Sequence, residues 1–156
     1  MEVVLLSILN SASGASLWRG YDYYTEHRVL RLEQLSDVQF KAAVLGSNKE
    51  PYTTLINTEH IKKSSCNCPH AAGTKIICKH IVAVYFTVFP EEAKKFYDEQ
   101  MAYQKEAEMQ QEELNQKLPY YIHSLKKAEL EEKLLGLLGE CPEWLRDRFV
   151  RDNLEG

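Results

Sequence analysis

Three cysteines and one histidine stand within fifteen residues of this chain, as a Cys-x-Cys pair followed after nine residues by a Cys-x-His pair: Cys66, Cys68, Cys78 and His80. Thiolates and imidazoles are the ligands that zinc prefers, and closed structural zinc sites commonly use three cysteines and one histidine around a tetrahedral ion. The spacing therefore predicts a structural zinc site that ties two neighbouring segments together.

The two ligand pairs are expected to come from different kinds of local structure. A single residue between Cys66 and Cys68 fits the bent end of a strand, where alternate side chains point the same way. Cys78 stands at the start of an apolar run typical of a helix, where free N–H groups and the helix dipole stabilise thiolate charge. Lys75 and Lys79 are expected to offset the site's negative charge. We predict a clip between a strand and a helix.

Other interpretations of these residues are weaker. A lone cysteine or histidine is more often an unconnected buried residue, but four ligand types in so short a stretch argue against that. His70 is an alternative ligand that we expect in an exposed loop shaped by Pro69 and Gly73. A catalytic zinc keeps an open position beside a general base. Glu59 is the nearest carboxylate and no His-Glu-x-x-His motif occurs, so we expect no enzyme. The other histidines are expected at the surface: His27, His60 and His123.

Composition limits the class of protein and its compartment. The chain has 156 residues, 44% hydrophobic and 27% charged, as in folded globular proteins. Its longest apolar runs, residues 3–9 and 81–86, are shorter than the roughly 20 residues of a membrane span. Residues 1–16 lack the basic start of a signal peptide, so we expect a mature N-terminus. Clustered cysteines with a spare Cys141 indicate metal binding in a reducing, cytoplasmic compartment.

The hydrophobic pattern predicts an α+β fold. It combines a small antiparallel β-sheet with a zinc-clipped helix, in a ββα-like arrangement, and continues into an α-helical C-terminal region. Apolar and polar residues alternate before the cysteines, which favours strands, and recur at helical spacing on either side. The expected elements are a helix near 15–26, a hairpin over 29–44, a strand at 52–58, an extended segment at 60–65, and a core helix at 78–89.

The C-terminal region is predicted to be helical and acidic. Pro90 opens a helix expected to end near Lys117, and after Pro119 the hydroxyl of Ser124 is placed to cap another helix closed by Gly139. A last helix follows from residue 141, and the two short C-terminal helices are expected to form a helical hairpin. The long helix carries a narrow apolar stripe, typical either of a solvated helix docked along one side or of pairing with a partner helix. We divide the chain into a finger domain, 1–89, and a helical region, 90–156.

The stretch SSCNCPHAAGTKIICKHIVAVYF at 64–86 resembles the SWIM-type zinc finger family, whose signature is Cys-x-Cys followed by Cys-x-His. Upstream, WRGYDYYTEHRVLRL at 18–32 is similar to the segment before the finger in bacterial SWIM proteins, where a glycine commonly occupies the place of His27. The resemblance implies a small sheet closed by a zinc-clipped helix that contacts proteins or nucleic acids. Some family members are associated with Swi/Snf-type helicases or recombination factors.

Charge separates two functional hypotheses. The formal net charge is −4, whereas nucleic-acid binders are usually basic. This charge favours a protein partner, and we predict a non-enzymatic interaction module. We expect that it binds neither a membrane nor a small-molecule substrate. The alternative is DNA or RNA binding through a local lysine patch, formed by Lys62, Lys63, Lys75 and Lys79. Within residues 90–113, acidic side chains outnumber lysines, with acids at 91, 92, 98, 99, 106, 108, 112 and 113.

Overall fold

The structure is a computed structural model that describes residues 8–154; residues 1–7 of the expected N-terminal segment lie outside them. The predicted α+β class is confirmed, with a four-stranded antiparallel sheet and 61% of the described residues in helices. The elements are α1 (Ile8–Ser11), α2 (Gly14–Thr25), β1 (Val29–Ser36), β2 (Gln39–Val44), β3 (Tyr52–Asn57), η1 (Ile61–Lys63), β4 (Ser65–Cys66), α3 (Lys79–Val88), α4 (Pro90–Ser124), α5 (Lys127–Glu140) and α6 (Glu143–Leu154).

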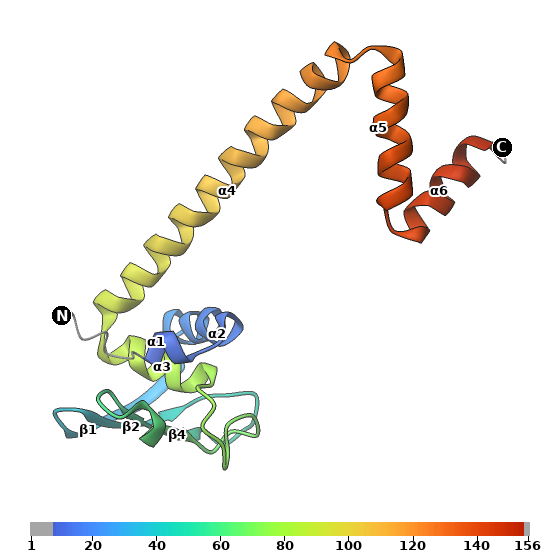
Figure 1. The fold of residues 1–156 in the computed structure, drawn as a ribbon. Helices are drawn as coiled ribbons and strands as arrows, with labels where there is room; N and C mark the ends of the chain where they lie inside the picture. Colours follow the sequence, from blue (N-terminus) through green and yellow to red (C-terminus); the bar gives the residue numbers. More distant parts are fainter. Residues whose placement is uncertain (1–7, 155–156) are drawn as a thin grey trace. The chain divides into compact units, whose positions relative to one another are not determined.

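The sheet follows the order of the chain, β1-β2-β3-β4, with antiparallel neighbours throughout. The predicted hairpin over 29–44 is confirmed, with Leu32 opposite Ala42 and Gln34 opposite Phe40. Figure 1 shows α1, α2 and α3 on one face of this sheet. The order makes β1 and β4 the edge strands, and β4 is the strand that carries the first metal ligand.

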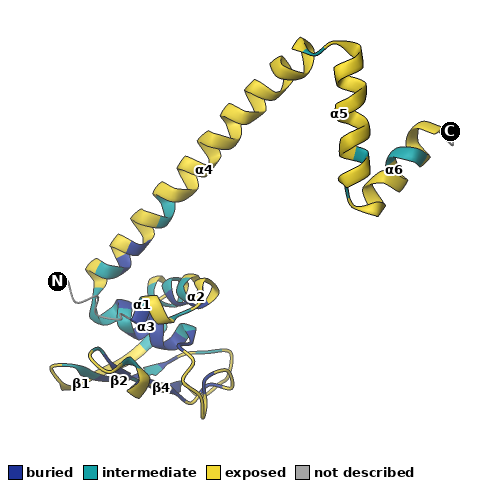
Figure 2. Cartoon of the chain, viewed as in Figure 1, coloured by how far each residue is buried: buried dark blue, intermediate teal, exposed yellow. Residues whose placement is uncertain are grey.

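The core lies between the sheet and α3. Alternate residues of β2 are buried, as period-2 patterning requires: Phe40, Ala42 and Val44. Five successive residues of α3, from His80 to Val84, are each at most 3% exposed. This confirms the prediction of a helix that is apolar on more than one face, and Figure 2 shows buried residues concentrated in this layer.

Leu17, Tyr21 and Tyr24, spaced by four and three residues along α2, lie on one face of the helix and pack against the core. The Tyr21 ring lies 6.0 Å from the ring of Phe86 in α3, edge to face, and 5.9 Å from that of Phe96 at the start of α4. Offset and edge-to-face aromatic pairs stabilise a core beyond the area that they bury. The rings therefore join α2, α3 and the first turns of α4 into one body.

The turn after α2 puts His27 in a backbone conformation that favours glycine. His27 has a φ of +54°, in the left-handed region. Its N–H donates to the carbonyl of Tyr24, and the Arg28 N–H donates to that of Tyr23, both at 3.0 Å. These two bonds define a Schellman motif, in which glycine is the preferred residue at the left-handed position. His27 adopts this conformation at a cost in backbone strain.

The expected extended segment at 60–65 is corrected by the structure. Between β3 and β4 the chain turns through η1 and only its end is a strand. The side-chain oxygen of Asn57 accepts hydrogen bonds from the N–H groups of Glu59, at 3.1 Å, and His60, at 2.6 Å. Asparagine in this role replaces a backbone partner and starts a turn, which the alternation of residue types did not reveal.

The long helix α4 does not end near Lys117 as predicted; it continues through Pro119 to Ser124. Proline has a φ compatible with a helix, so its ring costs the helix a hydrogen bond to the carbonyl four residues back without reversing the chain. Although α4 is long, it is polar. No helix among residues 8–154 is both long and apolar enough to cross a membrane.

The predicted cap of the next helix is also wrong. Ser124 belongs to the last turn of α4, where its hydroxyl donates to the carbonyl of Tyr121 at 2.7 Å. The residue that precedes α5 is Lys126, and its N–H is bound by the carboxylate of Glu129 at 2.8 Å. The acceptor is thus supplied from inside the helix, as in half of a capping box.

Two compact units make up the chain, residues 1–100 and residues 101–156. The first contains the sheet, the helices on it and the beginning of α4. The second contains the rest of α4 with α5 and α6. The boundary that we placed between residues 89 and 90 coincides with the junction of α3 and α4, and as a division of function it stays a prediction.

Candidate metal centre

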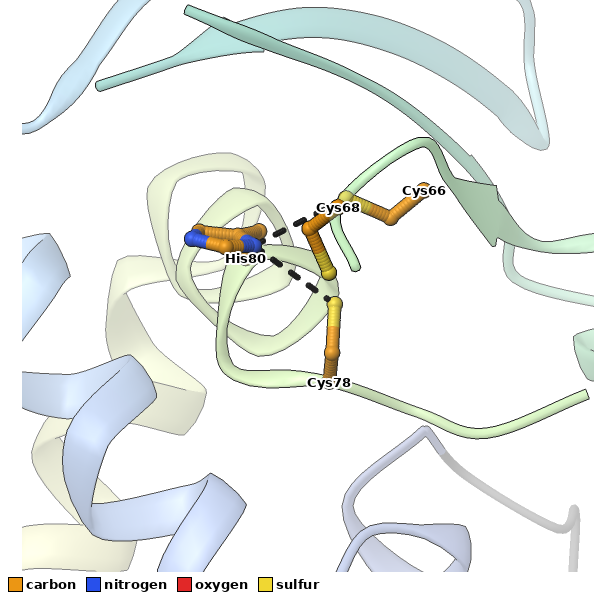
Figure 3. Close-up of side chains that lie close together, drawn as sticks. All are labelled: Cys66, Cys68, Cys78 and His80. Atoms are coloured by element: carbon orange, nitrogen blue, oxygen red, sulfur yellow. Dashed lines mark hydrogen bonds between the residues drawn. The ribbon is translucent and has the colours of Figure 1, made fainter. Parts of the chain in front are cut away.

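The four predicted ligands meet between the end of β4 and the start of α3. Cys66 ends the strand and Cys68 follows it in the loop, while Cys78 precedes α3 and His80 lies in its first turn. Figure 3 shows their sulfur atoms and the His80 ring directed toward one another. All four residues are buried. The clip between a strand and a helix is therefore present as geometry.

The distances suit a tetrahedral zinc ion. The four ligand atoms all lie within 4.8 Å of one another. The Nδ1 atom of His80 is 3.7 Å from the Cys66 sulfur and 3.8 Å from the Cys78 sulfur. Zinc–sulfur bonds of about 2.3 Å and zinc–nitrogen bonds of about 2.0 Å place tetrahedral ligand atoms roughly 3.5 to 3.8 Å apart. The donor set and its spacing fit a zinc ion, held through Nδ1 rather than Nε2 of the histidine.

The site favours a thiolate even before a metal enters. A hydrogen bond from Cys78 lowers the pKa of Cys66 to about 4, helped by His80 and by the hydroxyl of Thr54, which donates to the sulfur at 3.3 Å. The same shared proton raises the pKa of Cys78, and its burial adds to this. Zinc binding displaces that proton, because metal ligation requires the thiolate.

The surroundings of Cys78 and His80 orient the ligands by packing. No side-chain hydrogen bond caps α3 at Cys78; the raised pKa of this thiol, due to the hydrogen bond with Cys66 and to burial, is only partly offset by a hydrogen bond from the Ile81 N–H to the sulfur. The His80 ring is close to those of Tyr52 and Tyr23, with centroids 4.8 Å and 5.4 Å away. Its Nε2 atom is buried and has no hydrogen-bond partner among the described residues. The two tyrosine rings, not a carboxylate, set the orientation of this imidazole.

The loop between the ligand pairs turns where the sequence indicated. Gly73 has a φ of +72°, which only glycine adopts without strain. The N–H groups of Ala71 and Ala72 donate to the carbonyl of Cys68, at 3.0 Å and 2.9 Å, and close the first turn. His70 is exposed and lies outside the cluster of four ligand atoms.

The predicted lysine patch is divided by the fold. Three of its members, Lys62, Lys63 and Lys75, line a hollow of about 500 Å³ together with His60. Lys79 lies elsewhere, with its ammonium group 4.5 Å from the centre of the Tyr23 ring, and it lines a second hollow beside the metal ligands. Of the two lysines expected to offset the charge of the site, only Lys79 therefore borders it.

Sequence reasoning missed two contributors to the site. Thr54 hydrogen-bonds the Cys66 sulfur from the neighbouring strand, and Tyr52 packs on the His80 ring. Both come from β3, more than ten residues before the first ligand. The alternation of β3 indicates which of its residues face inward, but no local signal shows that the metal site lies beneath them.

A buried, closed cluster of three cysteines and one histidine that joins a sheet to a helix defines a zinc-binding module. The family model of the SWIM zinc finger matches residues 52–89. Residues 52–89 thus form a SWIM-type zinc finger, which begins at β3 and ends with α3. Tyr52 and Thr54, which contact the metal ligands, lie inside the matched segment. No curated protein sequence and no solved structure gives a significant match to the chain.

Proposed function

We propose that this chain is a non-enzymatic protein-binding module in which zinc stabilises the finger and the C-terminal helices contact the partner. The observation that carries the proposal is that α5 and α6 contain no buried residue and that α4 has none beyond Phe96. Leucine and tryptophan side chains on a helix are normally covered. In α5 and α6 no described residue buries the leucine and tryptophan side chains.

Three leucines of α5 lie on one face of the helix. Leu130, Leu134 and Leu137 are spaced by four and three residues, and their exposed fractions are 42%, 43% and 68%. Trp144 in α6 is 66% exposed. Tryptophan and leucine at helical spacing are typical anchors of a helix that binds in a groove. We call these four residues the helical surface.

Charge indicates the chemistry of the partner. Residues 90–156 carry 16 acidic and 10 basic side chains, whereas residues 1–89 carry 7 and 9. An acidic surface repels phosphate and attracts basic protein surfaces. The proposed partner is therefore a protein with a basic rim around an apolar groove.

The test compares the full chain with a double variant, Leu134→Ser and Leu137→Ser, in affinity purification from cells that produce the chain. A partner recovered in stoichiometric amount with the parent chain is expected to be lost with the variant. Zinc content and thermal stability stay unchanged, because neither leucine is buried. Glu132→Ser, on the same helix, is the matched control and retains the partner. Equal recovery with the double variant would contradict the proposal.

Nucleic-acid binding is the second candidate function, supported by the hollow that Lys62, Lys63 and Lys75 share with His60. Lysines brought together in this way attract phosphate groups despite an acidic chain. The test is titration of zinc-loaded protein with single-stranded and double-stranded DNA and with RNA at several salt concentrations. Replacing Lys62 and Lys63 by glutamate is expected to weaken binding and to flatten its salt dependence. Absence of binding leaves the helical surface as the functional one.

We also propose that the metal is structural and that the chain has no catalytic activity of its own. Four protein ligands complete a tetrahedron, so no coordination position stays open for water or substrate. The three ligand thiols and Cys141 are free cysteines, which fits a reducing compartment such as the cytoplasm. Zinc-dependent turnover of any substrate by the purified chain would overturn this part of the proposal.

A further inference from the structure

The edge strand β1 is unusually exposed. It pairs with β2 along one side and with no other strand of residues 8–154. Every residue after Val29 is exposed, including Leu30 at 54%, Leu32 at 43% and Leu35 at 47%. Folded proteins usually keep edge strands short or cover them, since unpaired backbone groups attract further strands. β1 is instead the longest strand of its sheet.

The register of β1 separates its side chains into two faces. Leu32 lies opposite the buried Ala42, so it belongs to the face that carries the core. Arg31 and Glu33, on either side of it, point to the opposite face, which α3 does not cover. Irregularities in the pairing occur between Val29 and Arg31 and again after Gln34. The stretch from Arg31 to Gln34 is regular and free to accept another strand.

We propose that β1 pairs antiparallel with β1 of a second copy of this chain, about a two-fold axis that passes through Leu32. In this register Leu32 faces its own equivalent on the core side. Arg31 of each copy faces Glu33 of the other on the solvent side. The arrangement contains two symmetric ion pairs and one leucine contact, and it joins two sheets into one.

The charges select this register over its neighbours. A slip by one residue would bring the core face of one sheet beside the solvent face of the other. Moving the axis to Arg31 places arginine opposite arginine, and moving it to Glu33 places glutamate opposite glutamate. Like charges directly opposite each other destabilise a strand pair. Because only the register centred on Leu32 satisfies both charges, the strand is complementary to itself, which argues for a second copy as the occupant.

Charge reversal tests the pairing in the full chain. Arg31→Glu and Glu33→Arg each place like charges at both cross-strand positions, so each variant alone is expected to dissociate. Sedimentation equilibrium should show a dimer dissociation constant higher by roughly 30-fold or more, because two pairs change from attraction to repulsion. Mixing the two variants restores one arginine and one glutamate at every position. The mixture is therefore expected to form heterodimers with an affinity close to that of the parent.

The controls separate this pairing from other effects. Glu50→Arg makes the same charge change at an exposed residue of the loop between β2 and β3, and it should leave the dimer intact. Unchanged zinc content in each variant shows that the fold persists, and recovery in the mixture shows the same independently. A parent chain that stays monomeric at high concentration overturns the proposal. Association that neither single charge reversal weakens also overturns it. Association through the helical surface would give that result.

Discussion

Cys66 shows how one residue joins the folding and the chemistry of the finger. Its sulfur lies within reach of His80 and Thr54, and its pKa is lowered to about 4. Substitution by serine removes a thiolate whose neighbours are arranged for a negative charge. The remaining ligands then face one another in a buried space without a complete metal shell.

We therefore expect Cys66→Ser to lose zinc and with it the cooperative unfolding of residues 1–100. Structural zinc contributes on the order of 10 kcal/mol in small metal-folded peptides, more than the sheet and helices are expected to compensate. Zinc analysis by plasma mass spectrometry and thermal denaturation check both parts. Cys141→Ser is the matched control, since that thiol lies outside the cluster, and it should retain one zinc ion per chain. Full zinc content in the Cys66 variant would exclude the ligand role.

His27 provides a second prediction at the scale of single residues. Its left-handed backbone ends α2, and its side chain is exposed, so little packing is lost when the side chain is removed. His27→Gly is expected to raise the free energy of unfolding by about 1 kcal/mol, as relief of strain exceeds the greater entropy of the unfolded glycine. His27→Val, which disfavours this conformation further, should lower it. Denaturant titration of the parent and the two variants measures these changes in the free energy of unfolding. A glycine variant that is less stable than the parent would contradict the argument.

At the scale of elements, the contact between α2 and α3 depends on the absence of a side chain. A Cβ atom at Gly20 would lie 2.4 Å from Cγ1 and 2.5 Å from Cβ of Val82, and 3.1 Å from the carbonyl oxygen of Lys79. A Cβ and a backbone oxygen are not flexible ends that rotate away. The two helices must therefore separate if any other residue replaces this glycine.

Gly20→Ala is thus expected to destabilise the finger by roughly 1 to 3 kcal/mol, the usual cost of overpacking. Helix propensity alone would favour alanine by about 1 kcal/mol, so the sign of the measured change decides which effect is larger. Gly14→Ala is the control in the same helix, because nothing lies within 4 Å of a Cβ there. Its stability should equal or exceed that of the parent in the same thermal melt.

At the scale of the whole molecule, the buried residues are confined to one of the two compact units. Residues 1–100 contain the sheet, the metal ligands and every buried residue of the described chain; residues 101–154 contain none. If the C-terminal helices bind the partner as we propose, residues 101–154 can be removed without loss of the stability of residues 1–100.

A chain truncated after Gln100 is expected to keep one zinc ion and a melting temperature within a few degrees of the full protein, because no buried residue is removed. Differential scanning calorimetry with zinc analysis tests this. The truncated chain should lose the partner recovered by the full protein. A large drop in melting temperature would show that the C-terminal helices stabilise the finger.

The sequence by itself determined the ligands, the order of the elements and the hairpin. Ligand pairs one residue apart and period-2 or helical patterns are local, so a short stretch contains all the information. The turn started by Asn57 and the true cap of α5 depended on individual side-chain hydrogen bonds. The continuation of α4 through Pro119 depended on a φ of proline that suits a helix. Only the tertiary structure decided that Lys79 lies apart from the other lysines, that Tyr52 and Thr54 complete the metal site, and that β1 forms an open edge. Those features join residues distant in sequence, and packing decides which of them meet.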